Sequence, residues 1–358
     1  MSTDGVTLQP GRPTPPPPRV AVRLRSGPVE LAAWHYPGTT GACVVMAGGF
    51  AVTKEPATDR FAARFHAAGL SVLAFDYRRL GGSGGSPRQV VRVREALDDW
   101  SAAVEHARTL PGVDGDRIAA WGFSASAGHI FALAARDRRL AAAVAQSANA
   151  GGPAATSHAM AFQHKGTALR VLGLGLLDAA GGLVGREPLL IPLGGRPGEV
   201  AALTTPDVPD GVRVLGAEAG YPDWPQVVAA RSVLTLGTYR PGRHAPRIAC
   251  PLLVVVCEDD HSALPAAAER VARRAPRGEL VRLPGGHYAP FLAAHEQAVA
   301  AHLDFLRRHL HLADPEEPRR ARPRIDGTVP ARAVTAATAP TAVQWEHSDD
   351  PSGRRDGP

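Results

Sequence analysis

A serine that could act as a nucleophile lies in the segment WGFSASAGH, Trp121 to His129, where an apolar run typical of a strand is followed by a helical pattern. A nucleophilic serine at such a sharp strand-to-helix turn needs small residues two positions before it and two after it, because the chain folds tightly there. Gly122 and Ser126 meet this need around Ser124, although Ser126 replaces the usual second glycine. The segment makes Ser124 a candidate for attack on a carbonyl carbon.

Ser126 is the alternative nucleophile, because Ser124 and Gly128 flank it at the same spacing. The predicted strand ends at Trp121 and Gly122, and a nucleophile at this kind of turn follows its strand directly, which favours Ser124. The same residues can also serve only as a tight turn and helix cap. Whether the segment is catalytic or only a structural turn therefore depends on the other segments of the chain.

Acidic residues and a histidine follow two later strands in an order that suits a catalytic triad. The apolar run 252–257 leads into CEDDH, which contains Asp259 and Asp260, and His287 lies in LPGGHYAPF, after a short strand and before the last helix. In a triad of the order Ser, acid, His, the histidine is the general base and the acid fixes its tautomer. We expect His287 to be the base and Asp260 the acid.

Each of these two roles has a second candidate. Asp259 is the alternative acid, and adjacent acidic residues are also typical of a solvated loop. His261 is the alternative base, but it lies very close to the acids in sequence. His129 could line the pocket from the helix after Ser124 or pack in the core.

A glycine-containing segment predicts where a developing negative charge would be held. MAGGF, which ends at Phe50, follows the third strand, and its two glycines allow the backbone to approach a substrate closely. In an architecture with a nucleophile after a strand, this loop supplies one N–H of the oxyanion hole, and the residue after the nucleophile supplies the other. We expect the N–H groups of Phe50 and Ala125 to be the donors.

A second glycine run, GGSGG at residues 81–85, superficially resembles a phosphate-binding loop. It lacks the GxGxxG pattern and the lysine of a P-loop, so we interpret it as a turn at the rim of the site. The cysteines and histidines show no zinc-binding spacing. We therefore expect no metal and no cofactor.

Short apolar runs alternate with helical patterns along most of the chain. Strands are predicted at 20–24, 29–34, 42–47, 70–75, 118–121, 141–145, 252–257 and 279–283, and helices at 60–68, 90–110, 125–135, 266–274 and 292–310. The first two strands suit an antiparallel pair. Alternation of apolar strands with helices predicts an α/β fold with a mostly parallel central sheet flanked by helices.

The alternation stops at about residues 150–245, which we interpret as an inserted lid within one domain spanning 19–311. Apolar residues at 171–177 and 189–193 predict a mainly apolar acyl pocket between lid and sheet, or else residues that pack the lid onto the core. Residues 1–18 are rich in proline and 312–358 in proline, arginine and small polar residues. Both ends are expected to be disordered.

The composition excludes several classes of protein. The formal charge of +6 comes from arginine, because Lys54 and Lys165 are the chain's lysines, and this pattern is typical of GC-rich coding rather than of a nucleic-acid partner. Three cysteines in apolar runs suit reduced thiols. The first residues contain no apolar signal core, and 171–185 is interrupted by Asp178 and too short to cross a bilayer. We expect a cytoplasmic protein without membrane or nucleic-acid partners.

Several segments together resemble a known family. MAGGFAVTKE, AFDYRRLGGSGGSPR, RIAAWGFSASAGH, the acids after 252–257 and GGHYAPF resemble bacterial members of the α/β-hydrolase superfamily related to S15-type peptidases and polyketide-transferase-like hydrolases. The resemblance covers about residues 20–310 and implies an α/β-hydrolase fold. The elbow of that group commonly reads WGxSxSGGH, which favours Ser124. Two departures are Gly48, where relatives usually have histidine, and Ala127, where they usually have glycine.

The resulting hypothesis is a serine hydrolase that cleaves an ester, thioester or amide of a small, apolar acyl substrate through an acyl-enzyme on Ser124. An acyltransferase that uses the same triad is one alternative. A binding protein that has lost catalysis on the same scaffold is another, for which the departure at Gly48 is the supporting feature. A homodimer is compatible with the sequence.

Overall fold

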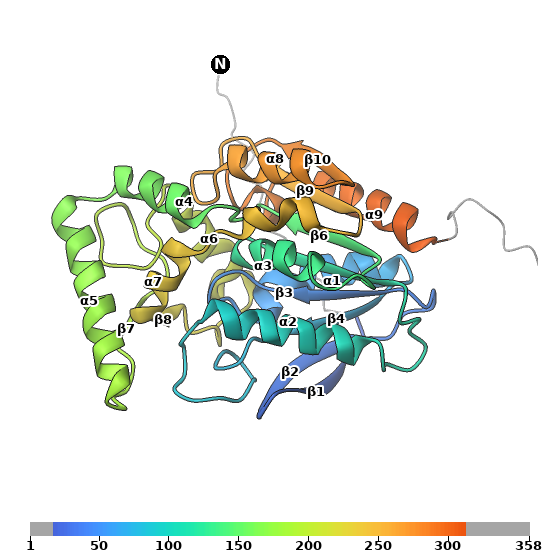
Figure 1. Ribbon diagram of the computed structural model, residues 1–358, viewed down its shortest axis with the longest axis horizontal. Helices are drawn as coiled ribbons and strands as arrows, with labels where there is room; N and C mark the ends of the chain where they lie inside the picture. Colours follow the sequence, from blue (N-terminus) through green and yellow to red (C-terminus); the bar gives the residue numbers. More distant parts are fainter. Residues whose placement is uncertain (1–16, 313–358) are drawn as a thin grey trace, which may run out of the picture. The chain divides into compact units, whose positions relative to one another are not determined.

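The computed structural model describes residues 17–312, which contain an eight-stranded sheet with the order β1-β2-β4-β3-β5-β6-β9-β10 (Figure 1). Its strands are β1 (Val20–Ser26), β2 (Val29–Tyr36), β3 (Cys43–Ala47), β4 (Ser71–Phe75), β5 (Ile118–Phe123), β6 (Ala142–Gln146), β9 (Leu252–Cys257) and β10 (Gly278–Leu283). The pairs β1–β2 and β2–β4 are antiparallel, and every other pair is parallel. The prediction of a mostly parallel sheet with an antiparallel pair at its start is confirmed.

Helices cover both faces of this sheet, so its central strands are buried throughout and mostly apolar. On one face lie α2 (Val93–Ala107), α3 (Ala125–Ala134) and α8 (Pro265–Arg274), and on the other α1 (Lys54–Ala67) and α9 (His295–Leu310). Side chains alternate between the two layers along each strand, as Val44 and Val45 of β3 do. All five residues of β3 are buried for this reason.

Helix α1 begins six residues earlier than the sequence predicted, at Lys54 rather than at residue 60. Its first turn contains Pro56, which is tolerated there because the first N–H groups of a helix have no partner within the helix. The helical spacing of apolar residues starts only with Phe61, so it could not reveal this turn. The early start matters because it brings Lys54 directly to the end of the loop after β3.

The insertion between β6 and β9, which we predicted to be a lid and call the lid below, contains elements of its own. These are α4 (Gly152–Ala159), α5 (Lys165–Leu183), α6 (Val208–Leu215), α7 (Arg231–Thr238) and an antiparallel pair of β7 (Leu190–Pro192) with β8 (Val227–Ala229). A 3-10 helix at Pro241–Arg247 leads back to the sheet. The predictions of disorder fall mainly on residues 1–16 and 313–358, outside the described part of the chain.

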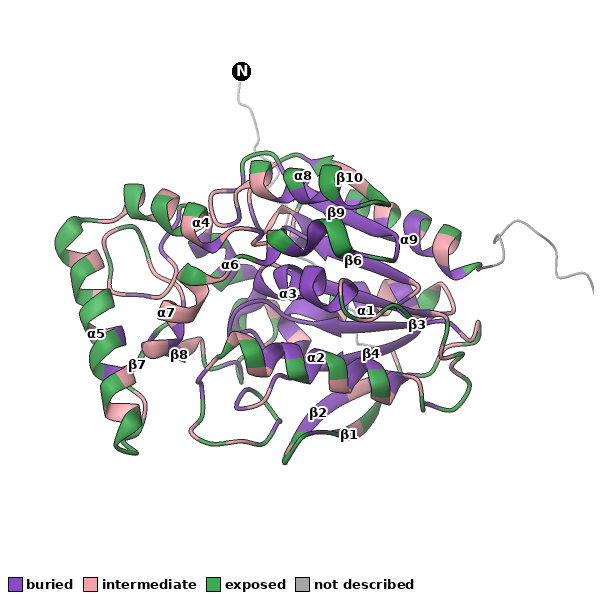
Figure 2. Ribbon diagram, viewed as in Figure 1, coloured by how far each residue is buried: buried purple, intermediate pink, exposed green. Residues whose placement is uncertain are grey.

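Helix α5 departs from the sequence predictions. Most of its leucines are exposed, Leu169 by 68% and Leu177 by 60% (Figure 2). Val171 and Leu174 are partly buried against the core, and the two buried residues of the helix are Gly175 and Asp178. The expectation that residues 171–177 line an acyl pocket is therefore wrong, because α5 packs through a narrow face that holds a carboxylate. Judged by length and composition alone, α5 is the one helix among the described residues that is long and apolar enough to cross a membrane. The apolar stretch is therefore longer than the segment 171–185 that we predicted to be too short to do so.

A buried ion pair fixes α5 to the rest of the lid. Asp178 accepts hydrogen bonds from Arg231 Nη2 at 2.7 Å, Arg231 Nε at 2.8 Å and the backbone N–H groups of Leu189 and Arg231, each at 2.8 Å. The side chain of Asp178 is fully buried and that of Arg231 is 10% exposed. This geometry explains why an aspartate interrupts the apolar run.

Replacing Asp178 with asparagine is expected to lower the free energy of unfolding by about 3 kcal/mol, because the change leaves a buried guanidinium without its counter-ion. Urea unfolding followed by circular dichroism measures this. The matched control is Asp304→Asn, which removes an exposed pair with Arg308 and is expected to cost about 0.5 kcal/mol or less. Equal losses in the two variants would contradict the structural role of Asp178.

Candidate active site

Ser124 lies in a strained turn between β5 and α3. Its backbone has φ 58° and ψ −117°, a conformation that is unfavourable for a residue with a side chain. A Cβ on Gly122 would lie 2.8 Å from the backbone carbon of Ser126, so only glycine fits at that position. The small residues that the sequence placed around Ser124 are thus required by the close approach of strand and helix.

Ser126 points into the core instead of toward the site. It is 1% exposed, its hydroxyl lies within hydrogen-bonding distance of the Tyr77 hydroxyl, and Trp100 Nε1 lies 3.3 Å from it. Trp100 Nε1 also donates to the Tyr77 oxygen at 2.7 Å. Burial raises the pKa of Tyr77, so this hydroxyl stays protonated. Ser126 is therefore part of a closed buried network.

His287 connects Ser124 to Asp260. Its Nε2 lies 3.0 Å from Ser124 Oγ, and its Nδ1 lies 2.7 Å from Asp260 Oδ2. His287 is 1% exposed and Asp260 4% exposed. The other carboxylate oxygen, Oδ1, accepts the backbone N–H groups of Ser262 at 2.9 Å and Ala263 at 2.6 Å. These bonds orient the carboxylate so that Oδ2 faces the imidazole.

The alternative acid and base lie elsewhere. Asp259 is exposed, and its backbone N–H donates to Gly285 O at 3.0 Å. The ring of His261 stacks on that of His158 in the lid, with centroids 5.6 Å apart and planes 3° from parallel. The geometry around Ser124 therefore favours Asp260 and His287 over both alternatives.

The loop after β3 lies against the serine, as the oxyanion hypothesis requires. A Cβ on Gly49 would lie 3.3 Å from the Cβ of Ser124, and Gly49, Phe50 and Ser124 line one cavity. Ala125 is the first residue of α3, and the first N–H groups of a helix have no partner within the helix. Both proposed donors thus belong to segments that border Ser124.

Gly48 occupies a place where this chain has no room for a side chain. A Cβ there would lie 2.8 Å from Val52 O and 3.0 Å from Thr53 O. Where relatives usually have a histidine side chain, the backbone of this loop itself fills the space next to Gly48.

The cavity above Ser124 is small and largely apolar. Its volume is about 30 Å³, and its wall combines lid side chains with Phe123 and Tyr288 of the core. The lid residues are Leu193, Gly194, Leu203, Val208, Gly211, Val212, Leu215, Trp224 and Gln226. Leu193 belongs to the predicted apolar segment 189–193, whereas Leu189 and Leu190 are exposed. Such a volume holds one or two water molecules beside Ser124, whose side chain is itself partly exposed.

Two lid residues that the sequence analysis missed contact the site's loops. Asp207 Oδ2 accepts the backbone N–H of His261 at 2.8 Å and the hydroxyl of Ser262 at 3.2 Å, which ties the lid to the loop of Asp260. Trp224 Nε1 donates to Ala51 O at 3.0 Å, which ties the lid to the loop of Phe50. Residues this far apart in sequence carry no spacing signal, so no pattern could have revealed these contacts.

The remaining candidate groups take no part in the site. Burial lowers the pKa of His129 to about 4, and its ring packs against those of Tyr77 and Tyr239. All three cysteines are free and buried, and burial raises the pKa of Cys257 to about 12, in agreement with unreactive core thiols. Across residues 17–312, no three side chains of His, Cys, Asp or Glu gather to hold a metal ion.

Replacing Asp260 with asparagine is expected to slow covalent labelling of the protein by a fluorophosphonate by about 10³-fold or more, since an amide stabilises the wrong tautomer of the histidine. Asp259→Asn is the matched control, because that side chain is exposed and adjacent in sequence. Its labelling rate is expected to stay within about twofold of wild type. A larger loss in Asp259→Asn than in Asp260→Asn would reverse the assignment of the acid.

Restoring a side chain at position 48 is expected to harm this protein. Both Gly48→Ala and Gly48→His should lower the melting temperature and slow fluorophosphonate labelling, because the new Cβ would press on the carbonyl groups of Val52 and Thr53. Gly166→Ala is the control, since nothing lies within 4 Å of its Cβ position. Faster labelling of Gly48→His than of wild type would show that the loop had room for the histidine.

Comparisons with known proteins agree with the fold. A model of the alpha/beta hydrolase family matches residues 9–302. The quorum-quenching protein AidA of Acinetobacter baumannii is 36% identical over 291 residues, which cover 80% of this chain and 94% of that protein. A thiohydrolase of Eupenicillium brefeldianum is 34% identical over 137 residues, 38% of this chain and 44% of that protein. The alpha/beta hydrolase GrgF of Penicillium sp. sh18 has a similar fold, with TM-score 0.70 and 24% identity over 82% of this chain and 99% of its own. The chain belongs to the alpha/beta hydrolase family, and it is a hydrolase-type enzyme.

Proposed function

We propose that this enzyme cleaves an acyl ester, thioester or amide through a covalent acyl-enzyme on Ser124. The observation that carries the proposal is the unbroken path of hydrogen bonds from Ser124 Oγ through His287 to Asp260, with distances of 3.0 and 2.7 Å. In this arrangement the histidine can take the hydroxyl proton at Nε2 while the carboxylate holds the proton on Nδ1. The strained turn at Ser124 keeps the hydroxyl at the cavity.

The proposed reaction has two steps that share this geometry. In the first, Ser124 Oγ bonds to the carbonyl carbon as its proton passes to His287, which then protonates the leaving alcohol, thiol or amine. The carbonyl oxygen becomes negative and is stabilised by the N–H groups of Phe50 and Ala125. In the second step, His287 takes a proton from water, the hydroxide attacks the acyl carbon, and Ser124 regains its proton.

The cavity wall favours an apolar acyl group. Leucine, valine and aromatic side chains dominate the lining, and the described wall contains no charged residue. Because the volume is small, we expect the lid to move when it admits this group. Because the chain is similar to a thiohydrolase, thioesters are substrates to test. Because it is also similar to a quorum-quenching protein, quorum-sensing signals are further substrates to test.

Acyl transfer is the second candidate function, and the small volume of the cavity is the observation that favours it. With little room for water beside Ser124, an alcohol, amine or carbon nucleophile that binds under the lid could compete for the acyl group. The acyl-enzyme is common to both reactions. Product analysis with such acceptors separates them, because transfer yields a new ester, amide or ketone in place of the free acid.

The test of the proposed function is intact-mass analysis of the protein after incubation with a fluorophosphonate. Wild type and Ser126→Ala are expected to gain one label, and Ser124→Ala none, because only Ser124 is hydrogen-bonded to His287. A small probe is needed because the cavity is small. If the folded wild-type protein stays unlabelled by the smallest probe and turns over no ester, the catalytic proposal fails and a non-catalytic scaffold takes its place.

A further inference from the structure

The loop that carries Phe50, residues 48–53 between β3 and α1, ends at a buried ion pair. The backbone N–H of Lys54 donates to Asp76 Oδ1 at 2.8 Å, and Lys54 Nζ donates to Asp76 Oδ2, also at 2.8 Å. Asp76 directly follows β4 and is 1% exposed, while Lys54 is 6% exposed. One carboxylate therefore holds both the backbone and the side chain of the residue that closes the loop.

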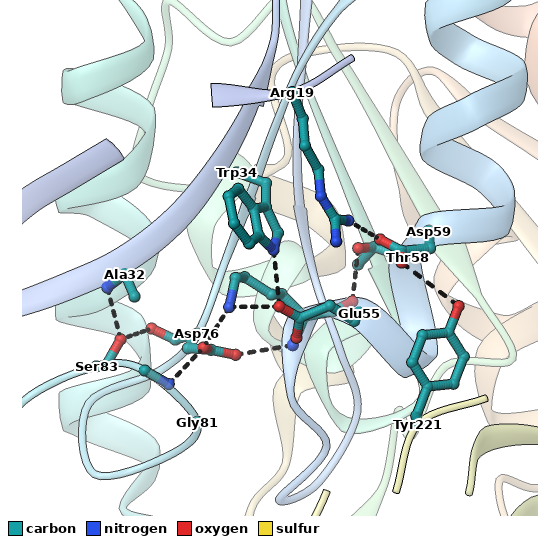
Figure 3. Close-up of polar contacts among 12 residues, drawn as sticks. Arg19, Ala32, Trp34, Glu55, Thr58, Asp59, Asp76, Gly81, Ser83 and Tyr221 are labelled. Atoms are coloured by element: carbon teal, nitrogen blue, oxygen red, sulfur yellow. Dashed lines mark hydrogen bonds and ion pairs between the residues drawn. The ribbon is translucent and has the colours of Figure 1, made fainter. Parts of the chain in front are cut away.

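The glycine run at residues 81–85 encloses this carboxylate (Figure 3). Gly82 donates its backbone N–H to Asp76 Oδ2 at 2.9 Å, and a Cβ on Gly81 would lie 2.3 Å from the same oxygen, at a φ of +46°. Ser83 Oγ donates to Asp76 O at 2.7 Å and accepts the N–H of Ala32 at 2.8 Å. The run that resembled a phosphate-binding loop thus binds an anion of the protein itself.

Further contacts fix the loop and its lysine from other directions. Glu55 Oε1 lies 2.8 Å from Lys54 Nζ and accepts Trp34 Nε1 at 2.7 Å, so the ammonium lies between two carboxylates (Figure 3). Ala51, in the middle of the loop, has a positive φ of 55°, and its carbonyl accepts the indole N–H of Trp224 from the lid at 3.0 Å. The loop is therefore held both at its end and at its tip.

We propose that Asp76 and Lys54 are positioning residues that aim the N–H of Phe50 at the oxyanion. The proposal rests on the proposed function, since it assigns a role within the same reaction. A preorganised donor contributes to catalysis only if it points to the position where the negative charge develops. Because a misplacement of about 1 Å can cost about 10²-fold in rate, a buried clamp at the end of this loop affects the chemical step without contacting the substrate.

The chain offers a matched control for Asp76. Asp99 is also fully buried and also binds one basic residue twice, since it accepts the backbone N–H of Arg78 at 2.9 Å and Arg78 Nε at 2.9 Å. Asp99 lies on α2, on the other face of the sheet from α1. Asp76→Asn and Asp99→Asn therefore remove equivalent charges, but only the first touches the loop of Phe50.

The experiment compares kcat, KM and the inhibition constant of a trifluoromethyl ketone, which forms an oxyanion when the serine attacks it. For Asp76→Asn we expect kcat to fall about 10- to 100-fold, KM to change less than about threefold, and the inhibition constant to rise in step with the fall in kcat/KM. Asp99→Asn, assayed where it is folded, is expected to keep all three constants within about twofold. Lys54→Met, which keeps the backbone bond but removes the ammonium, replaces Asp76→Asn if that variant does not fold, and a fall in kcat is expected again.

Two results would overturn the proposal while leaving the proposed function intact. One is a folded Asp76→Asn or Lys54→Met with wild-type kcat and inhibitor affinity. The other is an equal loss in Asp99→Asn, which would show a general effect of buried charge. If wild type itself neither labels with fluorophosphonate nor turns over substrate, the proposed function fails first, and the positioning role fails with it.

Discussion

The imidazole of His287 is the point on which the site depends, because it joins segments that are 163 and 27 residues away in sequence. Ser124 follows β5, Asp260 follows β9 and His287 follows β10. These strands are parallel, so their carboxyl ends meet at one edge of the sheet, where side chains from separate segments can converge. The turn at Ser124 adds the second constraint, since its strained backbone persists only because strand and helix approach so closely.

Three buried aspartates hold segments of this protein in a similar way. A buried aspartate accepts backbone N–H groups from the start of a neighbouring segment and pairs with a side chain that bears or can take up a positive charge. Asp260 binds the loop after itself and His287, Asp76 binds the start of α1 through Lys54, and Asp178 binds the start of α7 through Arg231. Charge-assisted bonds of this kind are short and directional, so they specify a loop position better than apolar packing does.

Much of this arrangement could be predicted from the sequence. The strand periodicity gave the sheet, and the order of Ser124, Asp260 and His287 at predicted strand ends selected the three side chains that the structure brings together. Both predictions succeeded because strands, turns and residue types are encoded by short segments of the sequence. The loop of Phe50 and its glycines were found in the same way.

What the sequence could not provide are contacts between distant segments and the burial of polar groups. The apolar residues of α5 suggested a pocket wall, but most of its leucines are exposed while Asp178 is buried, and the cavity is lined instead by lid residues around Val208 and Trp224. The partner of the glycine run at 81–85 was not predicted, because the run meets Asp76, and Asp76 meets Lys54, only through the three-dimensional fold. Hydrophobic periodicity contains no information about which carboxylate accepts a hydrogen bond from which backbone N–H group.

The proposed mechanism requires that the acyl group of the substrate is bonded to Ser124 during turnover. The most direct test is to quench the enzyme during turnover of an activated acyl ester, digest it and locate the acyl group by tandem mass spectrometry. We expect a transient acyl group on Ser124, formed faster than the steady-state rate. Steady turnover with no acyl group on the protein, or with the group on another residue, would contradict it.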